Sequence, residues 1–348
     1  MRRYDEIRSM LREAPQQWLV TGVAGFIGSH LLETLLTLDQ HVVGLDNFAT
    51  GYRRNLEDVL ARTNSTRGSF RLIEADIRDA DACLGACEGM DVILHQAALG
   101  SVPRSIVDPA LYHHVNVDGT VNMMIAAREA GVERFVYASS SAVYGDSEEL
   151  PKREARIGEA VSPYGLTKRM DEQYAEMMHR VYDQKSVGLR YFNVFGRRQE
   201  PRSQYAAVIP AWIRKLLRDE RCEIYGDGET TRDFCYIDNV VQANILAATV
   251  PLEGRDHIYN VGCGERTSLN DLFATIRDEL AVLRPELGSV EAVHGDFRPG
   301  DIRHSQADVT KIQAGLGYEP THLLAQGMRE TLEWYVNQFS ATSDRATA

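Results

Sequence analysis

Cysteine, long apolar runs and positive charge are all scarce in this chain. Its 348 residues include only five cysteines, with no C-x-x-C pair and no cysteine–histidine spacing typical of zinc; they lie at positions 83, 87, 222, 235 and 263. This pattern excludes a disulfide framework and predicts a reduced, cytoplasmic protein without a structural metal. No apolar run approaches the roughly 20 residues of a membrane-spanning helix. We therefore expect no membrane partner and no signal peptide.

Acidic residues outnumber basic ones by 50 to 38, which gives a formal net charge of −12. This balance argues against nucleic acid as the main partner. It does not exclude a small phosphorylated substrate, which needs only a few local arginines. The first fourteen residues are charged, with Tyr4, Ile7, Met10 and Leu11 at helical spacing. They predict an added surface helix, with a short targeting segment as the alternative.

Short β-rich runs alternate with helical patterns through the first 190 residues. The expected strands are Trp18–Thr21, His41–Leu45, Phe70–Ala75, Val92–Gln96, Arg134–Ser139 and Ser186–Arg190, with helices such as Ile27–Leu38 and Val117–Ala130 between them. Such alternation predicts a parallel sheet with helices on both faces. Later, helices are expected at Val208–Leu217, at Val240–Ala248 and from Leu269 onward, and His257–Val261 is expected to return to the main sheet.

A glycine motif, Thr21-Gly-Val-Ala-Gly-Phe-Ile-Gly28, stands between the first strand and the first helix. Its glycines allow a tight turn, a close approach to a pyrophosphate and close helix packing, with the helix amino end facing the anion. The spacing is T-G-x-x-G-x-x-G, and the alternative is a glycine turn of any βα unit. Asp46, eighteen residues after Gly28, can accept hydrogen bonds from the ribose of NAD and repel a 2′-phosphate.

Asp76 ends the third strand, where it can hold an adenine amino group; the alternative is a helix cap. These observations predict an α/β fold, a doubly wound parallel Rossmann sheet with a smaller interleaved α/β lobe that binds substrate. We expect a helical extension at 1–16, an NAD-binding domain at 17–192 with a returning segment at about 236–262, and the substrate lobe at 193–235 and 263–340.

Tyr164 and Lys168 are four residues apart and therefore share a helix face. Ser162 and Pro163 are the expected N-cap and first residue of that helix. A phenol ordinarily ionises near pH 10, so a tyrosine base at neutral pH needs positive charge nearby. A hydroxyl of the run 139–141, at the end of the fifth strand, can complete a proton path to the substrate.

The chain resembles the extended short-chain dehydrogenases/reductases, specifically the UDP-N-acetylglucosamine 4-epimerase branch of the UDP-galactose 4-epimerase family. The likeness covers roughly residues 17–335 and rests on TGVAGFIG, LDNFATG, HQAALGSVPRS, YASSSAVYGD, SPYGLTK, RYFNVFGRRQ, GDGETTRDFCYIDN and FRPGDIRHSQADVTK. It implies Ser140 as the catalytic serine, Tyr164 as general base and Lys168 as its assistant. It also implies a homodimer formed through a four-helix bundle.

The resemblance implies two further sets of contacts. The NAD-binding set is Gly22, Gly25, Phe26, Ile27, Gly28, Asp46, Asn47, Asp76, Ile77, Gln96, Ala97, Asn116, Tyr164, Lys168 and Tyr191. The substrate-binding set is Gly100, Ser101, Ser140, Ser141, Asn193, Ala207, Val208, Tyr225, Arg232, Arg298, Asp301 and Ser305. No metal is expected. Within the second set, Arg232 and Arg298 suit a diphosphate, Asp301 the uridine ribose, and Tyr225 the uracil.

The implied reaction is reversible inversion at C4 of UDP-N-acetylglucosamine, giving UDP-N-acetylgalactosamine. Tyr164 takes the 4-OH proton, C4 gives a hydride to NAD, and the 4-keto sugar turns over before the hydride returns. Related dehydratases and decarboxylases carry acids where this chain has Ser141 and Ala142. Enzymes restricted to UDP-glucose and UDP-galactose carry a tyrosine at Ser305, and a small residue there leaves room for an N-acetyl group.

Other functions remain open from the sequence alone. The alternative substrates are UDP-glucose/UDP-galactose and UDP-glucuronate; the last is disfavoured by Asn193, where such enzymes usually carry threonine. A net NAD-dependent nucleotide-sugar oxidoreductase is a second class, and Asp46 counts against its use of NADPH. A non-catalytic sensor is a third, against which the intact Ser140, Tyr164 and Lys168 stand.

Overall fold

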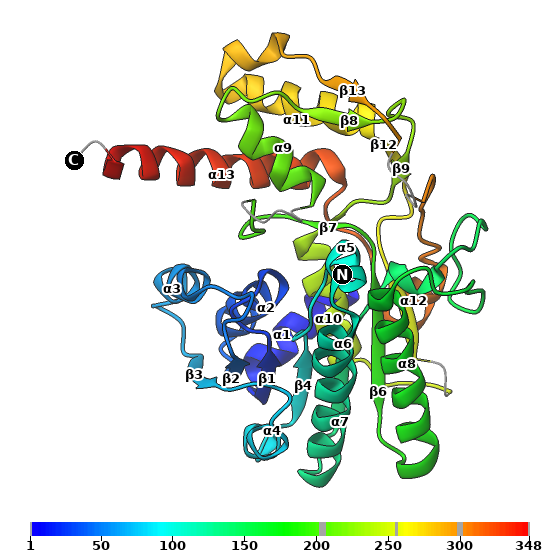
Figure 1. Ribbon diagram of the computed structural model, residues 1–348. Helices are drawn as coiled ribbons and strands as arrows, with labels where there is room; N and C mark the ends of the chain where they lie inside the picture. Colours follow the sequence, from blue (N-terminus) through cyan, green and yellow to red (C-terminus); the bar gives the residue numbers. More distant parts are fainter. Residues whose placement is uncertain (1, 202–206, 255–256, 298–301, 347–348) are drawn as a thin grey trace.

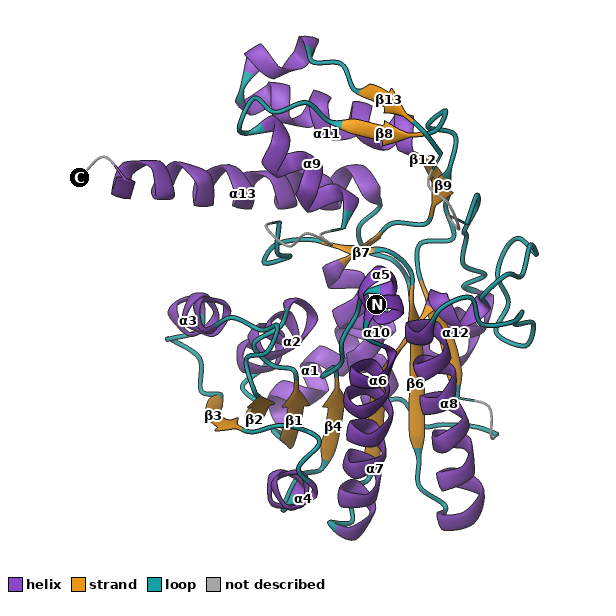
Figure 2. Ribbon diagram, in the orientation of Figure 1, coloured by secondary structure: helices purple, strands orange, loops and turns teal. Residues whose placement is uncertain are grey.

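The computed structural model describes residues 2–201, 207–254, 257–297 and 302–346. Within these residues a seven-stranded sheet has the order β11-β6-β5-β4-β1-β2-β3 (Figures 1 and 2). Its strands are β1 Gln17–Thr21, β2 His41–Asp46, β3 Ser69–Glu74, β4 Val92–His95, β5 Arg134–Ser140, β6 Ser186–Tyr191 and β11 Ile258–Val261. All neighbouring strands run parallel. The order reverses between β1 and β4, the switch point where such sheets bind ligands.

Helices cover both faces of the sheet, which confirms the expected doubly wound class. One face carries α2 Phe26–Thr37, α3 Arg53–Arg62 and α10 Ile237–Thr249; the other carries α4 Ala80–Cys87, α7 Gly119–Glu129 and α8 Pro163–Tyr182. Cys83 and Cys87 are fully buried in the apolar layer under the second face. Both side chains are therefore packing residues of this layer.

The N-terminal segment forms helix α1, Arg3–Glu13, which packs against α10. Its apolar face is narrower than the sequence predicts: Leu11 is buried, whereas Met10 is 46% exposed. Gln40 donates a 2.7 Å hydrogen bond from Nε2 to the carbonyl of Leu11, which ties α1 to the loop before β2. Among the described residues, the helices are all too short or too polar to cross a membrane.

The second group of elements lies above the carboxyl ends of the strands (Figure 1). It contains α9 Val208–Leu216, α11 Leu269–Leu283 and α13 Leu324–Ala346, and the short strands β8 Glu223–Tyr225, β9 Thr231–Arg232, β12 Thr267–Ser268 and β13 Val293–Gly295. Between β9 and β12 the chain returns to the sheet through α10 and β11. The two groups are thus interleaved, and the strand expected at His257–Val261 pairs with β6 as β11. The domain boundaries given above stay a prediction.

The remaining short elements are α5 Val102–Val107, α6 Pro109–Tyr112, β7 Val194–Phe195, β10 Cys235–Tyr236, α12 Thr310–Leu316, and 3₁₀ turns at Ser141–Tyr144 and Pro285–Ser289. The sequence predicted a regular helix at Val117–Ala130. Instead a π-helical turn, His113–Asp118, runs directly into α7. Such turns often occur where a helix serves a functional site.

Candidate active site

A cavity of about 1190 Å³ lies between the sheet and the second group. The expected residues that line it are Gly22, Gly25, Phe26, Ile27, Gly28, Asp46, Asn47, Asp76, Ile77, Gln96, Ala97, Gly100, Ser101, Ser140, Ser141, Tyr164, Tyr191, Asn193, Ala207, Arg232 and Ser305. Four expected site residues, Asn116, Lys168, Val208 and Tyr225, do not line it. Arg298 and Asp301 fall outside the described residues.

The glycine loop at the switch point leaves no room for side chains at two positions. A Cβ on Gly28 would lie 2.1 Å from the carbonyl oxygen of Gly22, and one on Gly22, whose φ is +67°, would lie 2.8 Å from the nitrogen of Ala97. A Cβ on Gly25 would meet only the Gly22 carbonyl, at 3.1 Å. Gly25 therefore keeps the cavity side of the loop open, as a pyrophosphate requires, and the first turn of α2 has no side-chain cap that would compete with an anion.

Asp46, at the end of β2, stabilises the glycine loop through hydrogen bonding. Its carboxylate accepts hydrogen bonds from the backbone nitrogens of Ala24, at 2.9 Å, and Phe48, at 2.7 Å. Burial raises the pKa of the Asp46 carboxyl, and these two bonds oppose the rise. Each oxygen keeps a second lone pair, so the residue can serve both the loop and a ribose hydroxyl.

The helix-cap alternative for Asp76 is wrong. The N-cap of α4 is Asp79, whose side chain accepts from the nitrogen of Ala82. Asp76 instead binds the side chains of Arg78 and Asn47 at the cavity wall. Hydrogen bonds from Arg78 lower the pKa of Asp76 to about 2.

The helix that carries Tyr164 begins as the sequence predicts. Ser162 is the N-cap and accepts a 3.1 Å bond from the nitrogen of Gly165, and Pro163 is the first residue of α8. Sequence reasoning missed Tyr112, a buried cavity residue whose ring meets that of Tyr164 edge to face, with centroids 6.4 Å apart. Tyr112 limits the orientations of the Tyr164 ring from the side of α6.

The serines of the 139–141 run have different roles. Ser139 donates to a carboxylate oxygen of Glu172 over 2.6 Å and is buried with it. Ser140 faces the cavity, and its hydroxyl oxygen accepts from the nitrogen of Ala142 at 3.1 Å. A hydroxyl that accepts there still has its proton to donate. Of these two hydroxyls, the one on Ser140 is therefore the one available to a substrate.

Lys168 lies beneath the cavity and is 2% exposed. Its ammonium group is 3.1 Å from a carboxylate oxygen of Asp171, three residues further along α8. The i, i+4 spacing correctly predicted a shared helix face with Tyr164. It gave no sign that a buried carboxylate would accompany the lysine.

Asn116 supports the cavity wall from outside. Its amide exchanges two hydrogen bonds with the backbone of Leu99, of 2.8 and 3.1 Å, and also donates to the hydroxyl of Thr167. The π-helical turn places this side chain beside the loop after β4. Leu99 and the next two residues line the cavity, so Asn116 acts on the site through them.

The wall above the sheet comes from loops of the second group. Asn193 donates from Nδ2 to the carbonyl of Asp233, and the nitrogen of Ser305 bonds to the carbonyl of Thr231. Asp233 is fully buried and accepts from the backbone nitrogens of Cys263, Gly264 and Ala307, at 2.9, 2.9 and 3.1 Å. One carboxylate thus holds together the loops that carry the small residues of this wall.

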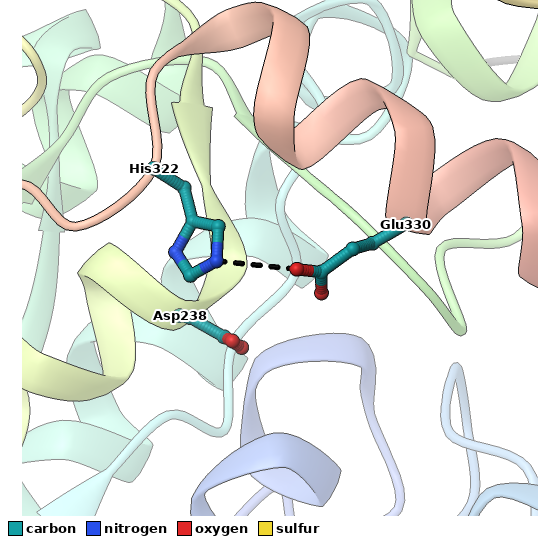
Figure 3. Close-up of side chains that lie close together, drawn as sticks. All are labelled: Asp238, His322 and Glu330. Carbon is teal, nitrogen blue, oxygen red and sulfur yellow. Dashed lines mark ion pairs between the residues drawn. The ribbon is translucent and has the colours of Figure 1, made fainter.

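Three side chains of types that can bind a metal ion lie close together (Figure 3), and none of them lines the cavity. One ligand atom from each of Asp238, His322 and Glu330 lies within 4.8 Å of the others. His322 pairs with Glu330 over 3.2 Å, and Glu330 also accepts from the hydroxyl of Tyr236 over 2.8 Å. These contacts join α13 to the start of α10. The expectation that the protein holds no metal stays a prediction.

Comparison with known proteins identifies the family. The model of the NAD dependent epimerase/dehydratase family matches residues 18–262, and the chain belongs to this family. A UDP-glucose 4-epimerase of Mycolicibacterium smegmatis is 38% identical over 92% of the chain and 98% of that protein.

Two solved structures show the same fold at substantial identity. One is a UDP-N-acetylglucosamine 4-epimerase from Methanobrevibacter ruminantium in complex with UDP-N-acetylmuramic acid, with a TM-score of 0.85, 36% identity, and 93% and 99% of the two chains covered. The other is a Thermus thermophilus UDP-glucose 4-epimerase complexed with NAD, with a TM-score of 0.79, 33% identity, and 92% and 99% covered. The protein is an NAD-dependent nucleotide-sugar 4-epimerase, as the resemblance implied.

Proposed function

We propose that the protein interconverts UDP-N-acetylglucosamine and UDP-N-acetylgalactosamine. The observation that carries this substrate is the small-residue wall of the cavity. Ser305 and Gly100 both line the cavity, and a Cβ built on Gly100 has no protein atom within 4 Å. This space accommodates an acetamide on C2 of the sugar, which a large side chain at either position would oppose.

The residues divide the chemistry between them. Tyr164 takes the proton of the 4-hydroxyl, and Ser140 orients that oxygen with its free proton. NAD, when bound, would accept the hydride from C4 of the sugar and later give it back. Arg232 binds the diphosphate, so that the flat 4-keto sugar can turn about this link and present its other face. Tyr164 then returns the proton, and the sugar leaves without net oxidation.

The residues at the switch point fit NAD. Gly25 leaves the loop open toward a pyrophosphate, and the end of β2 carries an acidic side chain. Gln96 and Tyr191 both line the cavity. The hydroxyl of Tyr191 donates a 3.0 Å hydrogen bond to the side-chain oxygen of Gln96 and accepts one from the side-chain amide of Asn244. This network fixes the wall under the expected nicotinamide position.

Substrate choice is tested by incubating the purified protein with UDP-N-acetylglucosamine, UDP-glucose and UDP-glucuronate in separate reactions and resolving the products. We expect conversion of the N-acetylated sugar with the highest kcat/KM. Conversion of UDP-glucose or UDP-glucuronate alone would contradict the proposal and assign the protein to one of the alternative substrates.

We also propose that the protein is a cytoplasmic homodimer paired through α8. Leu166, Tyr174 and Val181 lie at seven- and eight-residue spacing on this helix and are 43%, 39% and 58% exposed. An apolar stripe of this kind suits a helix bundle with a second copy. Light scattering should give twice the mass of the chain, and Leu166→Glu should return it to the monomer.

A further inference from the structure

The buried pair formed by Lys168 and Asp171 has a consequence for the proposed catalytic base. Both side chains are almost fully enclosed, with 3% and 1% of their surfaces exposed. Taking an ammonium ion out of water is costly unless a partner compensates its charge. Among the described residues, Asp171 is the carboxylate that forms an ion pair with Lys168.

The other groups around the pair do not replace that carboxylate. Glu172, the next residue of α8, is bound by Arg190 of β6 through two 2.8 Å bonds and by Ser139 of β5. Its charge is therefore matched by another cation. Thr120 of α7 approaches Asp171 but carries no charge.

His95, on β4, faces Lys168 and stays neutral. Burial, together with the charge of Lys168, lowers the pKa of His95 to about 3. Its ring nitrogens bond to the hydroxyls of Thr21 and Thr120, at 2.8 and 3.1 Å. Thr21 begins the glycine loop, so the lysine lies in a polar layer that reaches the cofactor side of the cavity.

We propose that Asp171 is a positioning residue that keeps Lys168 charged and in place beneath Tyr164. The proposal rests on the proposed function, because it concerns the base of that reaction. Without the carboxylate, a lysine this enclosed must give up its proton or move toward water. Either result removes positive charge from below the phenol and disfavours the phenolate.

The burial of Asp171 agrees with this role. Burial raises the pKa of its carboxyl to about 6, and Lys168 opposes the rise. Its second oxygen, Oδ1, has no hydrogen-bond partner among the described residues. Asp171 is thus held as an anion chiefly by the lysine, and each charge depends on the other.

Asp171→Asn, which keeps the shape and removes the charge, tests the proposal through the pH dependence of kcat. We expect the acid limb of the profile to move to higher pH by about one unit or more. The urea midpoint should fall as well, because a buried lysine without its partner destabilises the fold, so the pH profile is the readout that a purely structural role would not move. Asp171→Glu should recover part of the shift. The double variant Lys168→Met/Asp171→Asn should have the acid limb of its kcat profile at the same pH as Lys168→Met alone, because the carboxylate acts through the lysine.

A limb that stays in place or moves to lower pH in Asp171→Asn, or an additive effect in the Lys168→Met background, would overturn the proposal. A readout without substrate separates it from the proposed function. The ultraviolet titration of wild type minus that of Tyr164→Phe gives the ionisation of the Tyr164 phenol alone. The same difference between Asp171→Asn and Asp171→Asn/Tyr164→Phe gives it in the variant. We expect that phenol to ionise at higher pH in the variant. No shift would contradict the role of Asp171 whichever sugar the enzyme converts.

Discussion

The two halves of the cavity are built differently. The floor consists of strand ends and helix starts, and its polar groups bond to one another across the sheet, as Asp46 does with Ala24. The roof consists of loops and two-residue strands that one buried carboxylate, Asp233, holds together. The floor therefore determines a cofactor and a reaction that the family shares. The roof carries the small residues on which the proposed choice of sugar rests, and these residues can change without disturbing the floor.

The largest expected effect falls on the floor. Tyr164→Phe removes the proton acceptor and almost no volume, so turnover should fall by about 10²–10⁴-fold while NAD stays bound. Turnover and the nucleotide released on denaturation measure the two effects. A variant with more than about a tenth of wild-type turnover would show that another group is the base.

Asp233→Ala should produce the largest loss of stability in the roof. It leaves three buried backbone N–H groups without an acceptor, and each costs about 1–3 kcal/mol. We expect the free energy of unfolding in urea to fall by about 3 kcal/mol or more. The control is Asp227→Ala, which removes an exposed partner of Arg303 in the same group. Equal effects of the two variants would contradict the central place given to Asp233.

Ser305→Tyr should change selectivity without changing the floor. A phenol in the wall occupies the space for the acetamide, so kcat/KM for the N-acetylated sugars should fall at least about tenfold. UDP-glucose and UDP-galactose should be spared or improved, and Ser305→Ala should leave the ratio nearly unchanged. Equal loss on both classes of sugar would mean that the substitution only damages the site.

The smallest effect concerns stability and pH. Burial raises the pKa of Asp233 from 3.8 to about 6. The folded chain therefore binds this proton more tightly than the unfolded chain does. The stability that this tighter proton binding contributes is fully present below about pH 4, and it is lost as the pH rises to about 6. Unfolding of Asp233→Asn at several pH values should show a shallower decline over this range, and an unchanged slope would contradict the assignment.

The sequence predicted the floor well because its rules are local. Gly28 is required by a contact inside its own loop and Gly22 by its positive φ, and Ser162 with Pro163 marks a helix start within three residues. These features can be read from spacing alone. The fold class followed from the same alternation of strands and helices.

Features that depend on contacts across the fold could not be found in this way. The cofactor contact expected of Asn116 stays a prediction, but the spacing gave no sign that the π-helical turn would place its amide on the backbone of Leu99. Tyr112 meets Tyr164 only because α6 and α8 pack side by side. Asp171 was visible as an i, i+3 neighbour of Lys168, yet only the packing of α7, β5 and β6 against α8 shows that the pair is buried.

The most direct test of the account is epimerisation of UDP-N-acetylglucosamine in D₂O without added nucleotide, followed by proton NMR. Because one hydride leaves C4 and returns to it within a closed site, UDP-N-acetylgalactosamine should form with its C4 hydrogen still protium. Deuterium at C4, or a need for added NAD or NADH in proportion to product, would contradict it.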